Sequence, residues 1–216
     1  MKTKSLTILF FTVSILDIVG VAFNNSLLQI IFKPLIIPSL IALYYFSIDK
    51  KNNWYVVALI FSFLGDVLLM DKNNLFLFGI AAFLITQLLY IKIIASQLKK
   101  SNFIQKSIAL TPFVIFFFVL ITVLKDNLNQ FLVPVIIYGI AISVFGVIAL
   151  LNYQINKTKT AQLLIIGAVI FIASDSIIAL HKFHEPKSFY PVAIMITYVL
   201  AQYLIYKFMI KVSLKN

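Results

Sequence analysis

Long apolar runs alternate with short polar clusters along this chain. The clusters are rich in Asn, Lys, Asp and Pro, as in 49–53 (DKKNN) and 184–187 (HEPK), a composition typical of turns. A membrane-spanning helix needs about 20 mostly apolar residues, and the runs between the clusters have about that length. The pattern predicts eight spanning helices, over residues 5–23, 27–46, 54–70, 74–96, 108–124, 131–151, 160–181 and 188–212.

The composition agrees with this division. Hydrophobic residues make up 62% of the 216 positions and charged residues 12%, whereas ordinary soluble domains are roughly 45–50% apolar and about 25% charged. We therefore expect an all-α integral membrane protein, a bundle of about eight helices, with residues 1–216 forming one polytopic domain. The chain has no cysteine, which excludes disulfides, thiol chemistry and cysteine metal sites.

The net charge of +11 comes from lysine alone, and its distribution predicts a topology. With the N-terminus in the cytoplasm, eleven lysines fall in inside segments, four in outside loops and three within spans. This bias follows the positive-inside rule and predicts that both termini are cytoplasmic. The basic charge is thus explained without a nucleic-acid partner. The first apolar run contains Asp17 and lacks a clear small-residue cleavage site, so we interpret it as a retained helix and not a signal peptide.

Two acidic residues lie inside predicted spans: Asp66 in FSFLGDVLLM and Asp175 in FIASDSIIAL. A charge at the centre of a membrane helix costs roughly 2.5–3.5 kcal/mol on insertion scales, so such residues are rare and usually functional. We interpret both as candidate catalytic groups. The alternative is a structural pair of polar side chains that holds helices together.

The predicted topology places further charged groups at one depth. Asp17, Lys33, Asp66 and Asp175 all fall in the outer half of their helices. A lysine beside carboxylates offsets part of their desolvation cost. Lys33 is either such a partner or a side chain that extends to the outer headgroups, and Asp17 is interpreted as structural.

Uncharged polar residues follow the same helices. Ser62 lies one turn before Asp66, and Gly65 allows a close approach beside it. Two stripes, Phe83–Gln87–Tyr90 and Tyr198–Gln202–Tyr206, have helical spacing. A glutamine in lipid must find a partner, so both stripes are expected to face the bundle interior, as packing contacts or as substrate contacts.

A weak repeat is also visible. FSFLGD followed by TQLLYIK resembles FIASD followed by AQYLIYK, which suggests two halves, 1–100 and 101–216. His181, His184 and Glu185 lie together at a predicted helix end, but two histidines without a third convincing ligand make a poor zinc site. We interpret them as a solvated loop and expect no metal.

The polar positions carry a resemblance to a known family. The sequence resembles the YhhN family, whose animal members are lysoplasmalogenases, and the likeness extends in order over nearly the whole chain. The matching strings are Lys33-Pro34, Phe61-Ser62, Gly65-Asp66, Leu69-Met70, Phe78-Gly79, Phe83, Tyr90, Gly167, Phe171, Ser174-Asp175-Ser176, Thr197-Tyr198 and Ala201-Gln202. Many members of the family carry His where this chain has Gln87.

The resemblance implies an integral membrane hydrolase that cleaves the vinyl ether bond of lysoplasmalogens and needs no cofactor. Its partners would be a lysophospholipid substrate and membrane lipid, in a bacterial inner (cell) membrane. Asp66 and Asp175 match the positions expected to be catalytic. The residues expected to contact substrate are Lys33, Ser62, Gln87, Tyr90, Ser174, Tyr198 and Gln202.

Paired carboxyl groups suit this chemistry, because protonation of a vinyl ether gives an oxocarbenium-like cation. One aspartate would act as general acid, and the other would stabilise the cation and activate water, as in glycosidases. The sequence does not assign the two roles. Ser62 and Ser174 are candidates to orient the carboxyls, and Lys33 to bind the substrate phosphate.

Three other functions fit the same residues. A proton-coupled transporter also uses intramembrane acids, and Pro34, Pro38 and Pro134 are candidate kinks for its broken helices. A hydrolase of an ester or amide lysolipid would use the same site on another substrate. A non-catalytic lipid-binding protein would use the acids for stability alone. The head group and the oligomeric state stay open.

Overall fold

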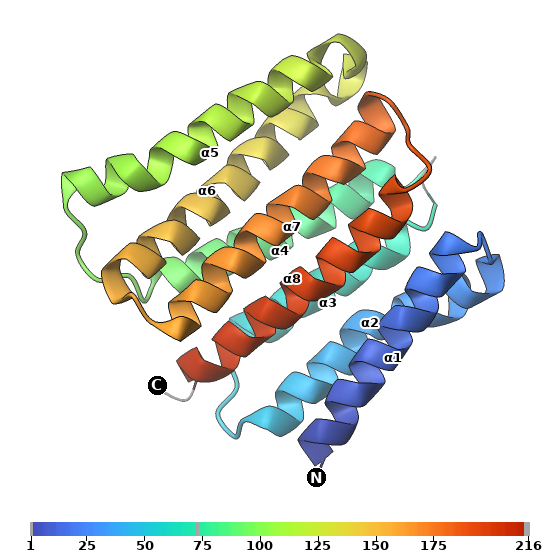
Figure 1. The fold of residues 1–216 in the computed structure, drawn as a ribbon, viewed down its shortest axis with the longest axis horizontal. Coiled ribbons are helices and arrows are strands. Elements are labelled where there is room, and N and C mark those ends of the chain that lie inside the picture. The colour runs from blue at the N-terminus through green and yellow to red at the C-terminus, as the bar shows by residue number, and fades with distance from the viewer. Residues whose placement is uncertain (1, 72–73, 214–216) are drawn as a thin grey trace. The chain divides into compact units, whose positions relative to one another are not determined.

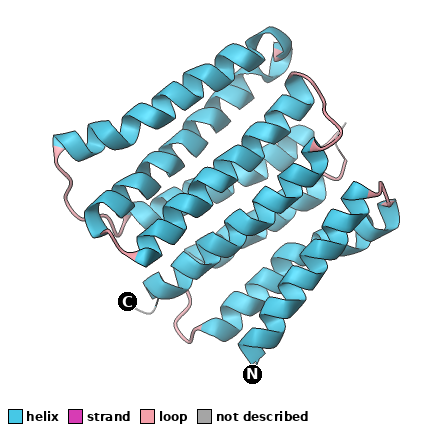
Figure 2. Ribbon diagram, viewed as in Figure 1, coloured by secondary structure: helices cyan, strands magenta, loops and turns pink. Residues whose placement is uncertain are grey.

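The computed structural model describes residues 2–71 and 74–213, and every regular element in these two ranges is helical (Figures 1 and 2). The predicted all-α class is confirmed. Two short 3-10 turns, η1 (Lys125–Asn127) and η2 (Asn129–Phe131), join two of the helices. The α-helices are α1 (Lys2–Ala22), α2 (Ser26–Ser47), α3 (Asn53–Leu68), α4 (Phe76–Ala95), α5 (Phe103–Leu124), α6 (Leu132–Asn156), α7 (Lys159–Phe183) and α8 (Tyr190–Ser213).

Polar residues in the separators start four of these helices. The side chains of Asn25, Asn52, Asn102 and Thr158 each accept a hydrogen bond from a backbone N–H in the first turn of α2, α3, α5 and α7. Such caps satisfy N–H groups that have no partner within the helix. The clusters that mark the ends of the apolar runs therefore also define where the helices begin.

Two helices extend five residues beyond the spans predicted from hydrophobicity. α5 begins at Phe103 and not at 108, because Asn102 and Gln105 form a reciprocal capping box ahead of the apolar run. α6 continues to Asn156 and not to 151, through a polar turn in which Asn156 Nδ2 donates to Asn152 Oδ1 at 2.9 Å. Hydrophobicity identifies the part of each helix that fits the lipid core, whereas side-chain hydrogen bonds extend the helix into the polar region.

The eight predicted spans correspond to the eight α-helices of the described ranges, of which α3 is the shortest. Seven helices in the described ranges are long and apolar enough to cross a membrane, and α3 is the shorter apolar one. Its 16 residues end at Leu68 and not at residue 70. At 1.5 Å per residue it is about 24 Å long, less than the roughly 30 Å hydrocarbon core. The seven spans indicate a multi-pass integral membrane protein.

The prolines proposed as kinks do not divide their helices. α2 is helical from Ser26 to Ser47 with Pro34 and Pro38 inside it. Pro134 lies in the first turn of α6, where a proline removes no intrahelical hydrogen bond. The broken helices expected of a transporter are therefore not found in α2 or α6.

The chain forms two compact units. Unit 1 comprises residues 1–89 and 206–216, and unit 2 comprises residues 90–205. In unit 1, α2 packs against both α1 and α3, and Figure 1 shows α1 and α2 side by side in blue. In unit 2, α6 packs between α5 and α7. The predicted repeat of 1–100 and 101–216 stays a prediction.

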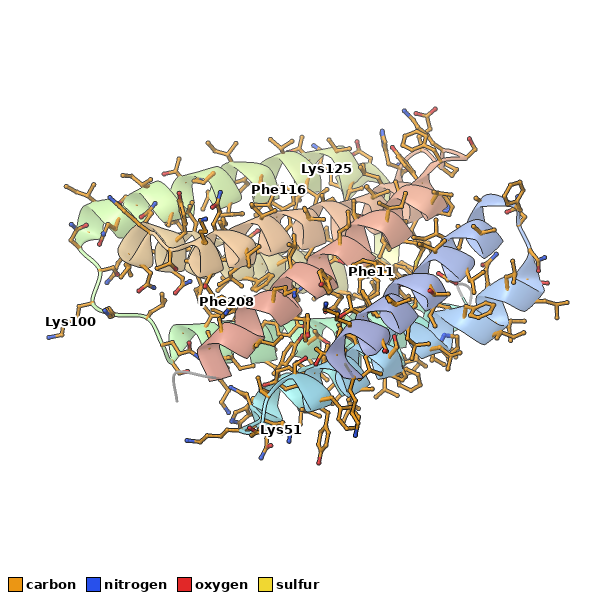
Figure 3. The ribbon with its side chains drawn as sticks, turned by 60° about the horizontal axis from the view of Figure 1, so that its bottom comes forward. Phe11, Lys51, Lys100, Phe116, Lys125 and Phe208 are labelled. Carbon is orange, nitrogen blue, oxygen red and sulfur yellow. The ribbon has the colours of Figure 1, made fainter. Side chains whose placement is uncertain are left out.

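Two lysines that the topology prediction uses lie just beyond the ends of α5. Lys100, in the connection between α4 and α5, is exposed and its side chain extends away from the ribbon (Figure 3). Lys125 is also exposed, just beyond the other end of α5. Lys72 and Lys215, which the charge count included, lie outside the described residues. The orientation of the chain in the membrane stays a prediction.

Candidate active site

Asp66 lies in the last turn of α3, on the buried face of that helix. Asp66 is only 4% exposed. Ser62, one turn earlier, and Gly65, its neighbour, are also buried. The spacing of the buried positions, 55, 58, 59, 62, 65 and 66, is that of a helix with one packed face. Asp66 therefore lies on the packed face of α3.

Helix α4 packs closely against α3 beside this aspartate. A Cβ placed on Gly65 would lie 2.7 Å from the ring of Phe83, so only glycine fits there without a shift. The Thr86 hydroxyl donates to the Ala58 carbonyl oxygen at 3.1 Å, and the Ser62 hydroxyl donates to Thr86 Oγ1 at 3.3 Å. Hydrogen bonds therefore join the two helices one turn from Asp66.

Thr86 was missed by sequence reasoning. A lone threonine in an apolar helix commonly bonds its own backbone, and Thr86 also does so, with the Ala82 carbonyl oxygen at 3.3 Å. The available signal was its position, directly before Gln87 and one turn after Phe83 in the predicted interior stripe.

Gln87 has an unusual environment for an amide. The side chain is fully buried, and neither amide atom has a hydrogen-bond partner among the described residues. Leaving a buried polar group unpaired costs roughly 1–3 kcal/mol. Its placement toward the interior is as predicted, and its free donor and acceptor are suited to a water or to a polar group of a substrate.

Asp17 and Lys33 lie on α1 and α2 of the same unit. Asp17 is fully buried and Lys33 is partly buried. Asp17 is five residues before the end of α1, Lys33 seven after the start of α2, and Asp66 two before the end of α3. Since α2 packs against both α1 and α3 and short connections reverse the chain between consecutive helices, all three charged residues lie toward the same end of unit 1.

Asp175 lies in unit 2, on the buried face of α7, and is 8% exposed. The Tyr138 hydroxyl of α6 donates a hydrogen bond to Asp175 Oδ2, with an O–O distance of 2.6 Å. A bond this short is typical of an O–H donated to a carboxyl oxygen. It fixes the orientation of the carboxyl group within the helix pair.

Sequence reasoning did not identify Tyr138. It lies in the apolar run 131–151 with no polar neighbour that marks it, and tyrosines are common at membrane interfaces. Its role depends on how α6 packs against α7, which the sequence pattern does not show.

Ser174 has a different partner from the one expected. Its hydroxyl donates to the Ile194 carbonyl oxygen of α8 at 3.1 Å. It therefore links α7 to α8, and it is Tyr138 that orients Asp175. Gly167, two turns earlier on α7, would bring a Cβ within 3.1 Å of Leu204 Cβ, so this helix pair is closely packed along its length.

The two predicted polar stripes lie in the interior, as expected. In unit 2, the Tyr90 hydroxyl donates to Gln202 Oε1 at 2.9 Å, and both residues are fully buried. The Tyr198 ring packs edge-on against Phe171, with centroids 5.9 Å apart. In unit 1, Tyr206 and Ser47 share a hydrogen bond of 2.8 Å between their hydroxyl groups. Gln202 is thus satisfied within the protein, in contrast to Gln87.

Each unit therefore carries one candidate catalytic aspartate, buried near hydrogen-bonding side chains of a neighbouring helix. Carboxyl groups in such surroundings are able to hold, donate or accept a proton where water is scarce. That the two carboxyls act on one substrate is a prediction from the sequence.

Comparison with known proteins identifies the family. The model of the YhhN family matches residues 28–209, a range that includes Lys33, the Asp66 and Asp175 helices, and both interior stripes. Searches among curated proteins and among solved structures gave no match. Since the match covers most of the sequence, from α2 to α8, the chain belongs to the YhhN family.

Proposed function

We propose that this protein is a membrane-embedded hydrolase that cleaves the vinyl ether bond of lysoplasmalogens. Membership of the YhhN family supports a membrane hydrolase in general. The specific reaction is inferred from the resemblance and from the site residues. The observation that supports it best is the burial of two aspartates, Asp66 and Asp175, in otherwise apolar helices.

The reaction begins with transfer of a proton from a carboxyl group to the alkene carbon farther from the ether oxygen. The resulting cation is shared between the other former alkene carbon and that oxygen. Water adds to this carbon and loses a proton, which gives a hemiacetal. The hemiacetal collapses to a fatty aldehyde and a glycerophospho-alcohol. One water is consumed, and the proton that was donated is returned.

The chain supplies the groups that these steps need. One aspartate is the general acid, and the other is the carboxylate that stabilises the cation and takes the proton from water. Tyr138 holds the Asp175 carboxyl in place through its 2.6 Å hydrogen bond. The unpaired amide of Gln87 is a candidate to hold the water or the ether oxygen. The apolar helices accept the alkyl chain from the lipid phase.

The test is turnover in detergent. The purified protein is incubated with a lysoplasmalogen and, separately, with an ester lysophospholipid of the same head group, and aldehyde and fatty acid are measured by mass spectrometry. We expect aldehyde from the vinyl ether. Asp66→Asn and Asp175→Asn should each reduce this rate by at least about a hundredfold, the scale of a lost general acid or base.

Matched controls separate catalysis from folding. Asp49→Asn and Asp126→Asn change exposed acids outside the helices that carry the site, one in each unit, and should keep full activity. Full activity in either site variant would contradict the two-aspartate mechanism. Fatty acid without aldehyde would change the substrate to an ester lysolipid, and no product from either lipid would favour transport or lipid binding.

A further inference from the structure

One end of unit 2 carries a group of positive charges that the proposed reaction does not use. Two segments contribute to it, the one that leads into α5 and the one between α6 and α7. Their lysines, termed the basic cluster, are all exposed: Lys99, Lys100, Lys106, Lys157 and Lys159. The sequence has no acidic residue between Asp71 and Asp126 or between Asp126 and Asp175. Neither segment therefore supplies a carboxylate that could neutralise the cluster.

Helix packing brings the two segments to the same end of the unit. Gly146 of α6 meets the Phe113 ring of α5. Earlier on α6, Gly139 meets the Phe117 ring, which lies later on α5. The two helices are thus antiparallel, and the start of α5 lies at the same end as the end of α6. Since α7 begins three residues after α6 ends, residues 157–159 lie at this end too.

The lysine side chains of the cluster have no counter-charge within the protein. None of them makes a hydrogen bond or an ion pair with a described residue, and the Lys100 side chain extends away from the ribbon (Figure 3). The opposite end of unit 2 is different, because Lys187 lies 4.0 Å from the Glu185 carboxylate and Lys125 is followed directly by Asp126. Like charges close together repel one another, so an anion from outside the protein would stabilise the cluster.

Exposed apolar residues lie directly beside the cluster on α5. Phe103 is 81% exposed and Leu110 is 52% exposed. Lys106 lies between them on the same helix face, at helical spacing, and Val114 continues that face into the apolar run. A ligand that covers this surface would have an anionic end at the lysines and an apolar body along the helix. A free phosphate or a nucleic acid lacks the apolar body.

We propose that the basic cluster binds the head groups of intact anionic diacyl phospholipids in the leaflet that it faces, with their acyl chains along α5. Groups of four to eight basic residues next to a spanning helix are typical of such binding. The lipid is a bound component of the membrane and is not hydrolysed. The proposal is therefore independent of the proposed reaction.

The first test keeps all five lysines and moves the fluorophore. Trp54 is the only tryptophan, so Trp54→Phe combined with Phe103→Trp reports on the lipid beside the cluster. The protein is reconstituted into mixed phosphatidylcholine and phosphatidylglycerol, with brominated chains on one lipid at a time, and quenching gives their relative binding constant. We expect phosphatidylglycerol to bind about fivefold more tightly, the effect of one lysine at an anionic surface. The preference should fall at high salt, and equal binding at low salt would overturn the proposal.

A matched reporter lies at the opposite end of the same unit. Phe189 is 58% exposed and lies two residues after Lys187, which pairs with Glu185. Trp54→Phe combined with Phe189→Trp should therefore show no preference between the two lipids. An equal preference for phosphatidylglycerol at both reporters would indicate a general attraction to a basic protein and would overturn the assignment to the cluster.

Substitutions of the lysines complete the test. Changing all five cluster lysines to Gln should abolish the preference at the Phe103→Trp reporter, and Lys106→Gln alone should lower it. Lys125→Gln combined with Lys182→Gln, at the opposite end, should leave it unchanged. A preference that survives in the Lys106→Gln protein and in the fivefold variant would show that the lysines are not the contact. Aldehyde production enters none of these measurements, so failure of the proposed reaction would leave the result intact.

Discussion

Buried polar side chains carry the functional information in this chain, because almost everything around them is apolar. Asp17, Asp66, Gln87 and Asp175 are each at most 8% exposed. Their partners differ: Asp175 accepts a hydrogen bond from Tyr138, whereas Asp17 and Gln87 have none among the described residues. Groups that the protein leaves unsatisfied are the natural contacts for a substrate or a water.

The Tyr138–Asp175 hydrogen bond gives a prediction at this scale. Tyr138→Phe removes the hydroxyl and keeps the ring. Hydrogen bonds to charged groups contribute roughly 1.5–3 kcal/mol, so we expect kcat to fall by at least about tenfold. If Tyr138 positions the carboxyl, the pH profile of kcat should move as well. The measurement is aldehyde release as a function of pH.

The control for this variant is Tyr153→Phe. Tyr153 lies on the same helix and is 37% exposed, and its hydroxyl group makes no hydrogen bond in the described part of the chain. It should keep wild-type turnover and pH dependence. A Tyr138→Phe enzyme with an unchanged pH profile and only a lower unfolding temperature would show that the tyrosine stabilises the helix pair and does not tune Asp175.

At the scale of the helices, close packing at glycine residues determines where the polar groups lie. Gly65 meets the Phe83 ring, and Gly146 of α6 meets the Phe113 ring of α5. In both cases an aromatic ring fills the space that a side chain would occupy. Without a strong hydrophobic drive between helices in lipid, such contacts and hydrogen bonds determine how spans associate.

Gly65→Ala tests this packing beside Asp66. The added Cβ would lie 2.7 Å from two ring carbons of Phe83, so α3 or the ring must move. Overpacking of this kind costs typically about 1–3 kcal/mol, and the protein should unfold at a lower temperature in detergent. The measurement is a thermal unfolding midpoint by circular dichroism.

A second substitution provides the internal check. Phe83→Leu shortens the side chain that the new methyl group meets. Relative to Phe83→Leu alone, Gly65→Ala should therefore cost less than it does in the wild-type background, as a double-mutant cycle measures. Additive effects of the two changes would place the strain elsewhere than at this ring.

At the scale of the whole molecule, lysine distribution and helix number together predict the topology. α5 separates Lys100 from Lys125, both exposed (Figure 3). The positive-inside rule places the first in the cytoplasm and the second outside. Because the chain has no cysteine, labelling of a single introduced cysteine reports the accessibility of that position alone.

Lys100→Cys and Lys125→Cys should therefore react with a membrane-impermeant maleimide from opposite sides. The measurement compares labelling of intact cells with labelling of inverted membrane vesicles. Detergent-solubilised protein, in which both thiols should react, controls for accessibility. Labelling of both positions from the same side would contradict a spanning α5 and the predicted orientation of the segments that follow it.

The sequence alone determined the helical class, the approximate spans and the residues of interest. The reason is that lipid requires long apolar runs with internally satisfied backbones, and any acid or glutamine within them stands out. Sequence reasoning placed the end of α3 two residues too late and missed the polar extensions of α5 and α6, because helix ends depend on capping and not on hydrophobicity alone.

Only the tertiary structure decided which polar groups meet. Tyr138 and Thr86 are inconspicuous in the sequence, yet one binds Asp175 and the other joins α3 to α4. Ser174, expected near a carboxyl, donates to a carbonyl of α8 instead. Helical periodicity places a residue on a face, but its partner is determined by the register of the neighbouring helix, which close contacts such as Gly65 with Phe83 fix in three dimensions.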